Sequence, residues 1–149
     1  MLCGARVGII NGYLPMSHAE QSSALYDAAR AAIDAGDLAE ALGLLEQSLA
    51  GDVHFKTLEL IGDVRCRLGR HREAIVPLAA ATGLNRGSRA PCLLAEAFIE
   101  LREWSDAQAA ATESLRRTPG YERARTALER AERELTAISS LDGGGSAGR

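Results

Sequence analysis

The stretch AGDLAEAL (residues 35–42) returns twice in altered form, as LGRHREAI (68–75) and as LREWSDAQ (101–108). In each copy a bulky or ring-bearing side chain is followed two residues later by an acid and then by an alanine. The three alanines, Ala41, Ala74 and Ala107, lie 33 residues apart. A fixed period of about 20–50 residues is the signature of a repeat array. The sequence therefore predicts three copies of one structural unit.

Composition narrows the fold class and the kinds of partner. Alanine, leucine, glutamate and arginine are frequent in the 149 residues and aromatic residues make up 4%, which favours helices over a large sheet. The formal net charge of -3 is too small to indicate nucleic acid or an acidic membrane as a partner. No apolar run reaches the roughly 18 residues of a membrane span. Three cysteines without a CxxC motif indicate reduced thiols in a cytoplasmic protein.

Helix signals divide the chain into pairs. Ser17 and Glu20 form a capping box for a first helix, Gly36 can end it in a left-handed turn, and Asp37 caps the second helix. The same alternation continues along the chain and predicts an all-α domain over residues 17–138, with repeats at about 22–54, 55–87 and 88–120 and a capping helix at 121–138. Residues 1–16 are predicted to be a flexible N-terminal segment, and residues 139–149, which contain GGGSAG, a flexible tail. Helices this short hide their apolar faces only against the next pair.

The copies also share small residues at fixed places. The first helix carries an apolar residue followed by a small one, as in Ile61 with Gly62, and the turn between the helices has Gly36, Gly69 or Arg102. These features, with the recurring alanine of the second helix, resemble the tetratricopeptide repeat (TPR), a helix–turn–helix unit of about 34 residues. The resemblance covers about residues 22–121. Ankyrin repeats have a period of about 33 residues as well, but their TPLHxA signature is absent.

The resemblance implies a right-handed α-solenoid of three TPR-like repeats plus a C-terminal capping helix. The first helices of the pairs are then expected to line a concave groove that binds a peptide or protein segment. By resemblance, the ligand-facing positions of the family fall on Tyr26, Arg30, Asp34, Lys56, Glu59, Asp63, Arg67, Arg89, Cys92, Glu96 and Ile99. This lining is charged with a few apolar positions, so we expect charges to set the register of a bound segment and apolar side chains to anchor it.

One subclass of the family grips the C-terminal carboxylate of heat-shock chaperones with lysines and asparagines. The matching positions in this chain are Tyr26, Arg30, Leu60, Arg89 and Leu93. Only two of these offer a cation and both asparagines are missing. The resemblance therefore does not extend to that co-chaperone role.

The sequence contains no recognisable catalytic or metal-binding constellation. The GGGSAG stretch has no strand before it and no helix after it, unlike a phosphate-binding loop. His18, His54 and His71 are isolated from one another, and His71 stands where repeats prefer a bulky packing residue. Cys66 and Cys92 are predicted to be small, semi-buried hydrophobic residues rather than nucleophiles, because no base is placed beside them in the sequence. We therefore predict that the protein is not an enzyme and has no cofactor and no metal.

The predicted function is an adaptor or chaperone-like module that binds a protein or peptide. A dedicated secretion chaperone is the alternative, and such a chaperone would act as a homodimer joined through its N-terminal segment. Residues 22–54 hold six acids and one arginine, a net charge of -5, whereas residues 55–87 have a net charge of +3. Three explanations of this asymmetry stay open: a chance distribution of surface charges, an extended partner of complementary charge, and head-to-tail self-association of the protein. A single lysine against sixteen arginines indicates a GC-rich bacterial genome.

Overall fold

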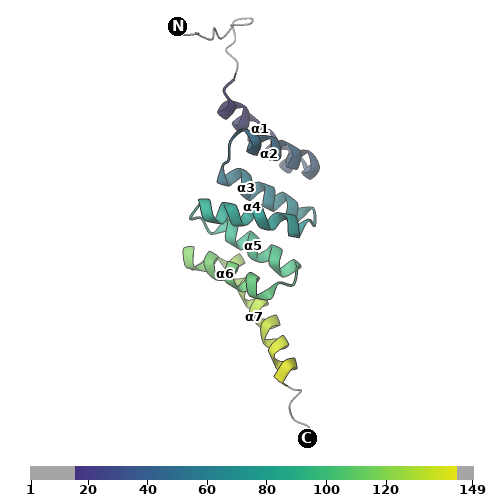
Figure 1. Cartoon of the computed structure of the whole chain (residues 1–149), viewed down its shortest axis with the longest axis vertical. Helices are drawn as coiled ribbons and strands as arrows, with labels where there is room; N and C mark the ends of the chain where they lie inside the picture. Colours follow the sequence, from purple (N-terminus) through teal and green to yellow (C-terminus); the bar gives the residue numbers. More distant parts are fainter. Residues whose placement is uncertain (1–15, 144–149) are drawn as a thin grey trace, which may run out of the picture.

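The protein, described over residues 16–143 by a computed structural model, is all-helical in that range. Its helices are α1 (His18–Ala35), α2 (Leu38–Gly51), α3 (Phe55–Arg67), α4 (His71–Leu84), α5 (Arg89–Glu100), α6 (Trp104–Arg117) and α7 (Glu122–Gly143). Figure 1 shows them stacked one after another along the long axis of the molecule, with α1 and α7 at opposite ends of the stack. Consecutive helices pack as the pairs α1–α2, α3–α4 and α5–α6, and α7 packs against α5 and α6. The predicted all-α solenoid is confirmed.

The helix ends form where the sequence places their signals. The backbone N–H of Glu20 donates to Ser17 Oγ at 3.2 Å, and the backbone N–H of Ser17 donates to Glu20 Oε2 at 2.7 Å, so the predicted capping box is present. Gly36 ends α1 with φ of 84°, and the Asp37 carboxylate accepts from the backbone N–H of Glu40 at 3.0 Å to begin α2. Both predicted caps of the first turn are confirmed.

The turn inside each pair keeps one backbone shape, although its residue changes. Gly36 and Gly69 have φ of 84° and 74°, and Arg102, at the same place in the third copy, has φ of 59°. In the third copy the backbone N–H of Glu103 donates to the carbonyl of Phe98 at 2.9 Å, which closes the turn. An L-residue with a side chain is strained in this left-handed conformation. Packing of the helix pair therefore overrides the local preference of Arg102.

Small side chains allow the two helices of each pair to cross closely. Ala41, Ala74 and Ala107 are all 0% exposed, as the 33-residue period predicts. The small residue of the first helix is equally constrained in the second copy, where a Cβ added to Gly62 would overlap the side chain of Leu78. A larger residue at such a crossing would overpack the contact. The repeated small residues are thus the physical basis of the array.

In two of the three pairs, a buried serine side chain forms a hydrogen bond to the other helix of the pair or to its cap. Ser48 Oγ donates to the carbonyl of Ser22 at 2.8 Å in the first copy, and Ser114 Oγ donates to the carbonyl of Ser88 at 2.8 Å in the third. The matching residue in the second copy is Ala81, which is fully buried and has no hydroxyl. The three copies therefore share their packing while differing in their polar contacts.

The last helix is longer than the sequence predicts. The capping helix was expected to end at Ile138 and a flexible tail to begin at residue 139, but α7 runs to Gly143. Residues 139–142 contain no Pro or Gly, and Ser139 Oγ donates to the carbonyl of Leu135 at 3.0 Å within the helix. The predicted flexible tail is thus wrong for residues 139–143, whereas residues 144–149, and residues 1–15 of the predicted N-terminal segment, lie outside the described residues. In residues 16–143, no helix combines the length and the apolar character that crossing a membrane requires.

Candidate functional site

The first helices of the pairs present rows of corresponding residues. Tyr26 on α1 corresponds to Glu59 on α3, and Arg30 corresponds to Asp63, each 33 residues further along the chain. The helices α3 and α5 contact one another, as do α5 and α7. Side chains on this face therefore meet across neighbouring repeats. We call a junction closed where these side chains form ion pairs with one another, and open where the charged side chains form none.

Ion pairs close the face between α3 and α5. The guanidinium of Arg89, in the first turn of α5, donates to Glu59 Oε1 at 2.7 Å and to Asp63 Oδ2 at 2.9 Å on α3. The carboxylate side chains are mostly buried, with 14% and 18% of their area exposed. Hydrogen bonds between charged groups are about twice as strong as neutral ones. Three of the predicted ligand-facing residues are thus bonded to one another.

The same kind of contact joins α5 and α7. Arg123 on α7 donates to Glu96 Oε2 at 2.6 Å, and Arg130 donates to Glu100 Oε1 at 3.4 Å. Ile99, between these two acids, is buried and lines a shallow hollow of about 260 Å³ with Arg123 and Arg130. The predicted contact residue Glu96 is therefore already paired with a cation of its own chain.

The junction between α1 and α3 has no such pairs. Lys56 stands where Arg89 stands one repeat later, while Tyr26 and Arg30 replace the two acids. Within residues 16–143, neither Arg30 nor Lys56 forms an ion pair. An aromatic ring and two cations with no acidic partner therefore occupy this junction.

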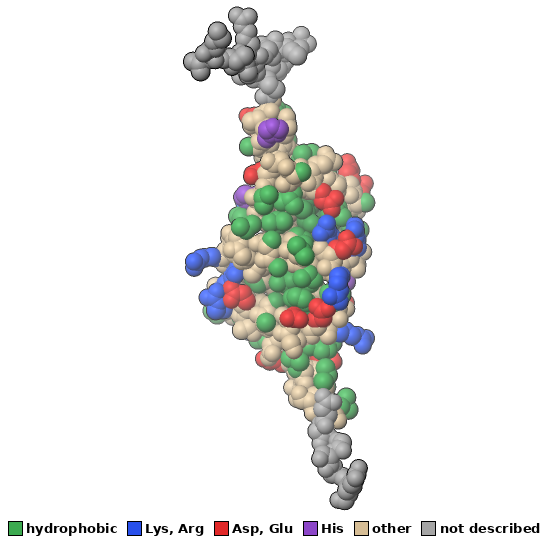
Figure 2. All heavy atoms as spheres, in the orientation of Figure 1, with side chains coloured by type: hydrophobic (Ala, Val, Ile, Leu, Met, Phe, Trp, Pro, Cys, Tyr) green, Lys and Arg blue, Asp and Glu red, His purple; other side chains and the backbone are tan. Residues whose placement is uncertain are grey.

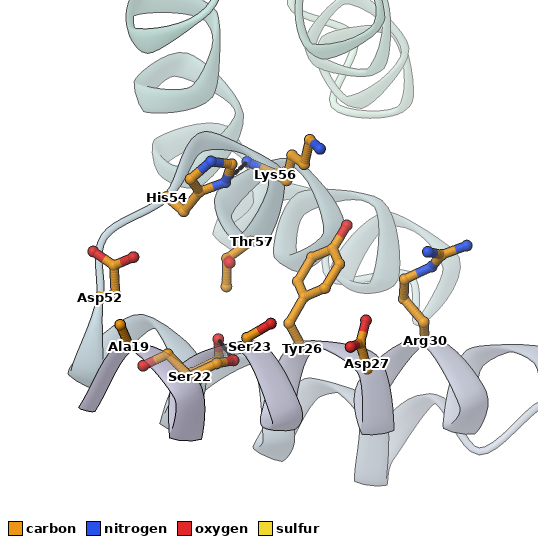
Figure 3. A pocket seen from close by; sticks show the side chains of 11 residues that line it. Ala19, Ser22, Ser23, Tyr26, Asp27, Arg30, Asp52, His54, Lys56 and Thr57 are labelled. Atoms are coloured by element: carbon orange, nitrogen blue, oxygen red, sulfur yellow. Dashed lines mark hydrogen bonds between the residues drawn. The ribbon is translucent and has the colours of Figure 1, made fainter. Parts of the chain in front are cut away.

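A hollow of about 410 Å³ lies at this junction. It is lined by Ala19, Ser22, Ser23, Tyr26, Asp27, Arg30, Ser48, Asp52, His54, Lys56 and Thr57. Figure 3 shows the Tyr26 ring standing up from α1 toward α3, with Arg30 on one side and the Lys56 side chain above it. His54 Nδ1 accepts from the backbone N–H of Lys56 at 3.2 Å, which caps α3 at the rim of the hollow. The hollow thus combines a half-buried aromatic ring, two cations, the two carboxylates of Asp27 and Asp52, and several hydroxyl groups.

A second hollow continues along the groove. It has about 340 Å³ and is lined by Tyr26, Arg30, Ile33, Asp34, Leu60, Asp63 and Arg89. Tyr26 and Arg30 belong to both hollows and therefore lie between them. Of the other predicted residues, Lys56 lines only the first hollow and Asp34 only the second. The ligand-facing role of these four residues stays a prediction.

Two predicted residues lie away from this groove surface. Cys92 is 0% exposed, and burial raises the pKa of its thiol to about 11, with a smaller contribution from Glu96. Arg67 is exposed at the end of α3 and lines neither hollow. Cys92 therefore belongs to the core, because its helix turns that position toward its neighbours.

Sequence reasoning missed the ion pairs and several residues of the hollow. The partners of Arg89 are 26 and 30 residues away, a little less than one repeat. A search for opposite charges at that separation would have found them. Ser23, Asp27 and Thr57 reach the hollow as well, but no charge or spacing signal marks them in the sequence.

The described residues offer little for covalent or metal chemistry. Burial also raises the pKa of the Cys66 thiol to about 11, with Asp63 adding to the effect, so both described cysteines are protonated at neutral pH. Within residues 16–143, His, Cys, Asp and Glu side chains nowhere gather in a group of three or more that could hold a metal ion. The arrangement at α1 and α3 is suited to non-covalent recognition of a charged segment.

Comparisons with known proteins agree on the fold. No family model and no curated protein matches the sequence. Among solved structures, the chain is similar to the Sgt2 TPR domain from Aspergillus fumigatus, with 20% identity, a TM-score of 0.76 and coverage of 85% of this chain and 87% of that one. It is also similar to the first TPR of Spaghetti (RPAP3) bound to the HSP90 peptide SRMEEVD, with 17% identity, a TM-score of 0.76 and coverage of 79% and 95%. The MamA protein matches with 20% identity, a TM-score of 0.74 and coverage of 78% and 64%.

Proposed function

We propose that this chain, which has the fold of a tetratricopeptide-repeat solenoid, binds an extended acidic segment of another protein in the groove at α1 and α3. Solved structures of the same fold that hold a bound peptide support this proposal. The observation that carries the finer proposal is the unpaired state of Arg30 and Lys56 beside Tyr26, within the described residues. An acidic ligand can pair with these cations without first breaking an ion pair of the protein.

Two solved structures support a peptide as the ligand. The first TPR of Spaghetti (RPAP3) is bound to the HSP90 peptide SRMEEVD, and the second TPR domain of human RPAP3 is in complex with the HSP70 peptide SGPTIEEVD. Both peptides carry acids near their ends. In this chain Arg89, one of the two cations at the matching carboxylate-gripping positions, is held by Glu59 and Asp63. We therefore propose an acidic segment in general rather than a heat-shock C-terminus.

An adaptor or chaperone-like role in the cytoplasm is part of this proposal. The alternative secretion chaperone depends on a dimer made by the N-terminal segment, and residues 1–15 of that segment lie outside the described residues. Nothing in the described helices favours that alternative, so it stays a prediction. Deleting residues 1–22 would test it by sedimentation.

The proposal is tested by selecting peptides from a random library on the wild-type protein and measuring their Kd by fluorescence anisotropy. Acidic peptides are expected to be enriched. The double substitution Arg30→Glu with Lys56→Glu is expected to weaken them about 10- to 100-fold, because each lost charged hydrogen bond costs about 1.5–3 kcal/mol before screening.

The matched control is Arg133→Glu, which reverses an exposed cation of α7 that forms no ion pair within the described residues. This control is expected to leave Kd unchanged. Peptides that bind the double variant and the wild-type protein equally well would contradict the proposed site.

A further inference from the structure

Thr57 on α3 is a buried residue whose hydroxyl group has no hydrogen-bond partner within residues 16–143. The residue is 3% exposed and lines the hollow between α1 and α3. Thr82 Oγ1, by comparison, donates to the carbonyl of Leu78 at 2.8 Å, as threonines inside helices often do. No such bond forms at Thr57, because the residue four places earlier is Val53, which lies before the start of α3. A buried hydroxyl group without a hydrogen bond costs free energy, so the hollow contains an unsatisfied polar group.

Neither packing nor helix formation explains this hydroxyl group. The residue that corresponds to Thr57, 33 places further on, is Ala90, which is 2% exposed in the first turn of α5. An alanine thus fills the same buried position of the third copy without an unpaired polar group. Alanine is also a better helix former than threonine. A polar residue that costs stability where the fold accepts alanine is a candidate contact for a ligand.

The first turn of α3 supplies further hydrogen-bond donors beside Thr57. Because α3 begins at Phe55, the N–H groups of its first turn have no carbonyl partner inside the helix. His54 Nδ1 accepts from the N–H of Lys56, which leaves the N–H groups of Phe55 and Thr57 without a bond within the described residues. The N-terminal end of a helix also carries a partial positive charge. This part of the hollow is therefore suited to an anion.

The opposite wall of the hollow, formed by α1, adds two more hydroxyl groups. Ser22 is 6% exposed, and Ser23, the next residue, is exposed. Neither serine side chain forms a hydrogen bond in the part of the chain that the structure describes. Figure 3 shows both serines on α1, across the hollow from Thr57 and Lys56 on α3. Hydroxyl groups from two helices and one ammonium group therefore line the same space.

Two carboxylates of the hollow limit where an anion can lie. Figure 3 shows Asp52 at the opposite end of the hollow from Arg30, and Asp27 next to Arg30 on α1. Thr57 lies between the two acids in this view. On the face seen in Figure 2, basic and acidic side chains are interspersed near the edges of the stack, so an anion is attracted by specific donors and not by one field of positive charge. A run of carboxylates along the hollow would approach Asp27 or Asp52, whereas one compact anion near Thr57 avoids both.

We propose that the hollow at the first turn of α3 holds a phosphate group of the bound segment, a proposal that rests on the function proposed above. A phosphorylated serine or threonine carries a charge of about -1.5 to -2 at neutral pH and three strong acceptor oxygens. A carboxylate has fewer oxygens and a smaller charge, so it would leave more of the donors around Thr57 unpaired. A phosphorylated segment therefore gains hydrogen bonds that a segment of Asp and Glu alone does not form.

The test uses short degenerate peptide libraries that are identical except at the central residue, which is phosphoserine, glutamate or serine. The Kd of each library for the full chain is measured by fluorescence anisotropy. The wild-type protein is expected to bind the phosphoserine library at least about 10-fold more tightly than the glutamate library, because charge-assisted hydrogen bonds are the stronger ones. Thr57→Ala is expected to remove this preference. Thr57→Ser, which keeps the hydroxyl group, is expected to retain it.

The matched control is Thr136→Ala, which removes a hydroxyl group from an exposed threonine of α7. It is expected to leave the preference for phosphoserine unchanged. Thermal melting separates a binding role of Thr57 from a structural one. Thr57→Ala is expected to keep the melting temperature or to raise it, because alanine fills the corresponding position of α5. A preference for phosphoserine that Thr57→Ala leaves intact would overturn the proposed phosphate site.

Failure of the phosphate site is distinguishable from failure of the proposed function. If the wild-type protein binds the phosphoserine and glutamate libraries equally, and Arg30→Glu with Lys56→Glu weakens both, the phosphate site is overturned while an acidic segment remains the ligand. If only the phosphoserine library binds, and its binding depends on Thr57, the phosphate site is supported and the broader acidic ligand is wrong. If neither of these libraries binds more tightly than the serine library, both proposals are overturned.

Discussion

The junction between α1 and α3 and the junction between α3 and α5 are made of corresponding residues, yet their groove faces differ. At the later junction Arg89 is held by Glu59 and Asp63. At the earlier one Lys56 meets Tyr26 and Arg30 and forms no ion pair within the described residues. Identical spacing thus produces one face stabilised by internal ion pairs and another free to pair with a ligand.

This difference shows how a repeat array divides its tasks. The buried alanines Ala41, Ala74 and Ala107 are shared by all copies because every pair must pack closely. Groove residues are free to vary from copy to copy, since they lie outside that packing. Under the proposed function, Tyr26 and Arg30 at the positions of Glu59 and Asp63 leave the cations of the earlier junction available to a ligand.

Helix α3 belongs to both junctions, and Ala74 lies where α4 crosses it closely. The largest loss of stability is therefore expected from Ala74→Trp. Ala74 is 0% exposed between α3 and α4, and an indole there would overpack the contact. We expect the free energy of unfolding to fall by at least about 3 kcal/mol, measured by urea denaturation. Ala39→Trp, at an exposed position of α2, is the control. Equal stability of the two variants would show that the assigned register is wrong.

The two junctions are compared directly by Arg89→Ala and Lys56→Ala. Loss of Arg89 leaves Glu59 and Asp63 without their cation and is expected to cost about 1–2 kcal/mol of unfolding free energy, allowing for partial exposure. Lys56→Ala, at the corresponding position, is expected to cost less than about 0.5 kcal/mol. Thermal and chemical denaturation of both variants provide the measurement. If both variants lose a similar free energy of unfolding, the two junctions do not differ in their internal ion pairing.

A gain is expected from Arg102→Gly in the third turn. Arg102 has φ of 59°, a conformation that glycine adopts without strain, so the substitution is expected to add about 1 kcal/mol of stability. The reverse change, Gly69→Arg, is expected to cost a similar amount in the second turn. Melting temperatures of the two variants should move in opposite directions. If Arg102→Gly destabilises the protein, the contacts of the arginine side chain contribute more free energy than the strained backbone conformation costs.

The smallest change in stability, with a large change in binding, is expected from converting the open junction into a closed one. Tyr26→Glu with Arg30→Asp copies the acids of the later junction and supplies partners for Lys56. We expect stability to change by less than about 1 kcal/mol, as for exposed ion pairs, while acidic peptides selected on the wild-type protein no longer bind. In this background Lys56→Ala should become costly, as Arg89→Ala is. Unchanged peptide binding would contradict the role of the open junction.

Most of the fold could be predicted from the sequence. Gly36, Asp37 and the buried alanines act through local sterics and hydrogen bonds, which depend only on residue type and spacing. The end of α7 could not be placed, because the residues after Ile138 neither favour nor break a helix strongly. The positive φ of Arg102 was unexpected for a residue with a side chain, since tertiary packing imposes it.

The candidate site could be predicted only in part. The resemblance to the tetratricopeptide repeat assigned Tyr26, Arg30 and Lys56 to the ligand-facing surface, and in the structure these three residues line one hollow. It assigned Cys92 to the same face, but the side chain there is fully buried. Pairing of Arg89 with two acids on another helix depends on the separation and rotation of the two helices, which no local pattern encodes.

The sequence alone determined a stack of helical hairpins, because small side chains recur wherever two backbones must approach closely. Only the tertiary structure decided which charges of the groove are satisfied and which remain available. The physical reason is that an ion pair between repeats depends on distances of a few ångströms between side chains about thirty residues apart.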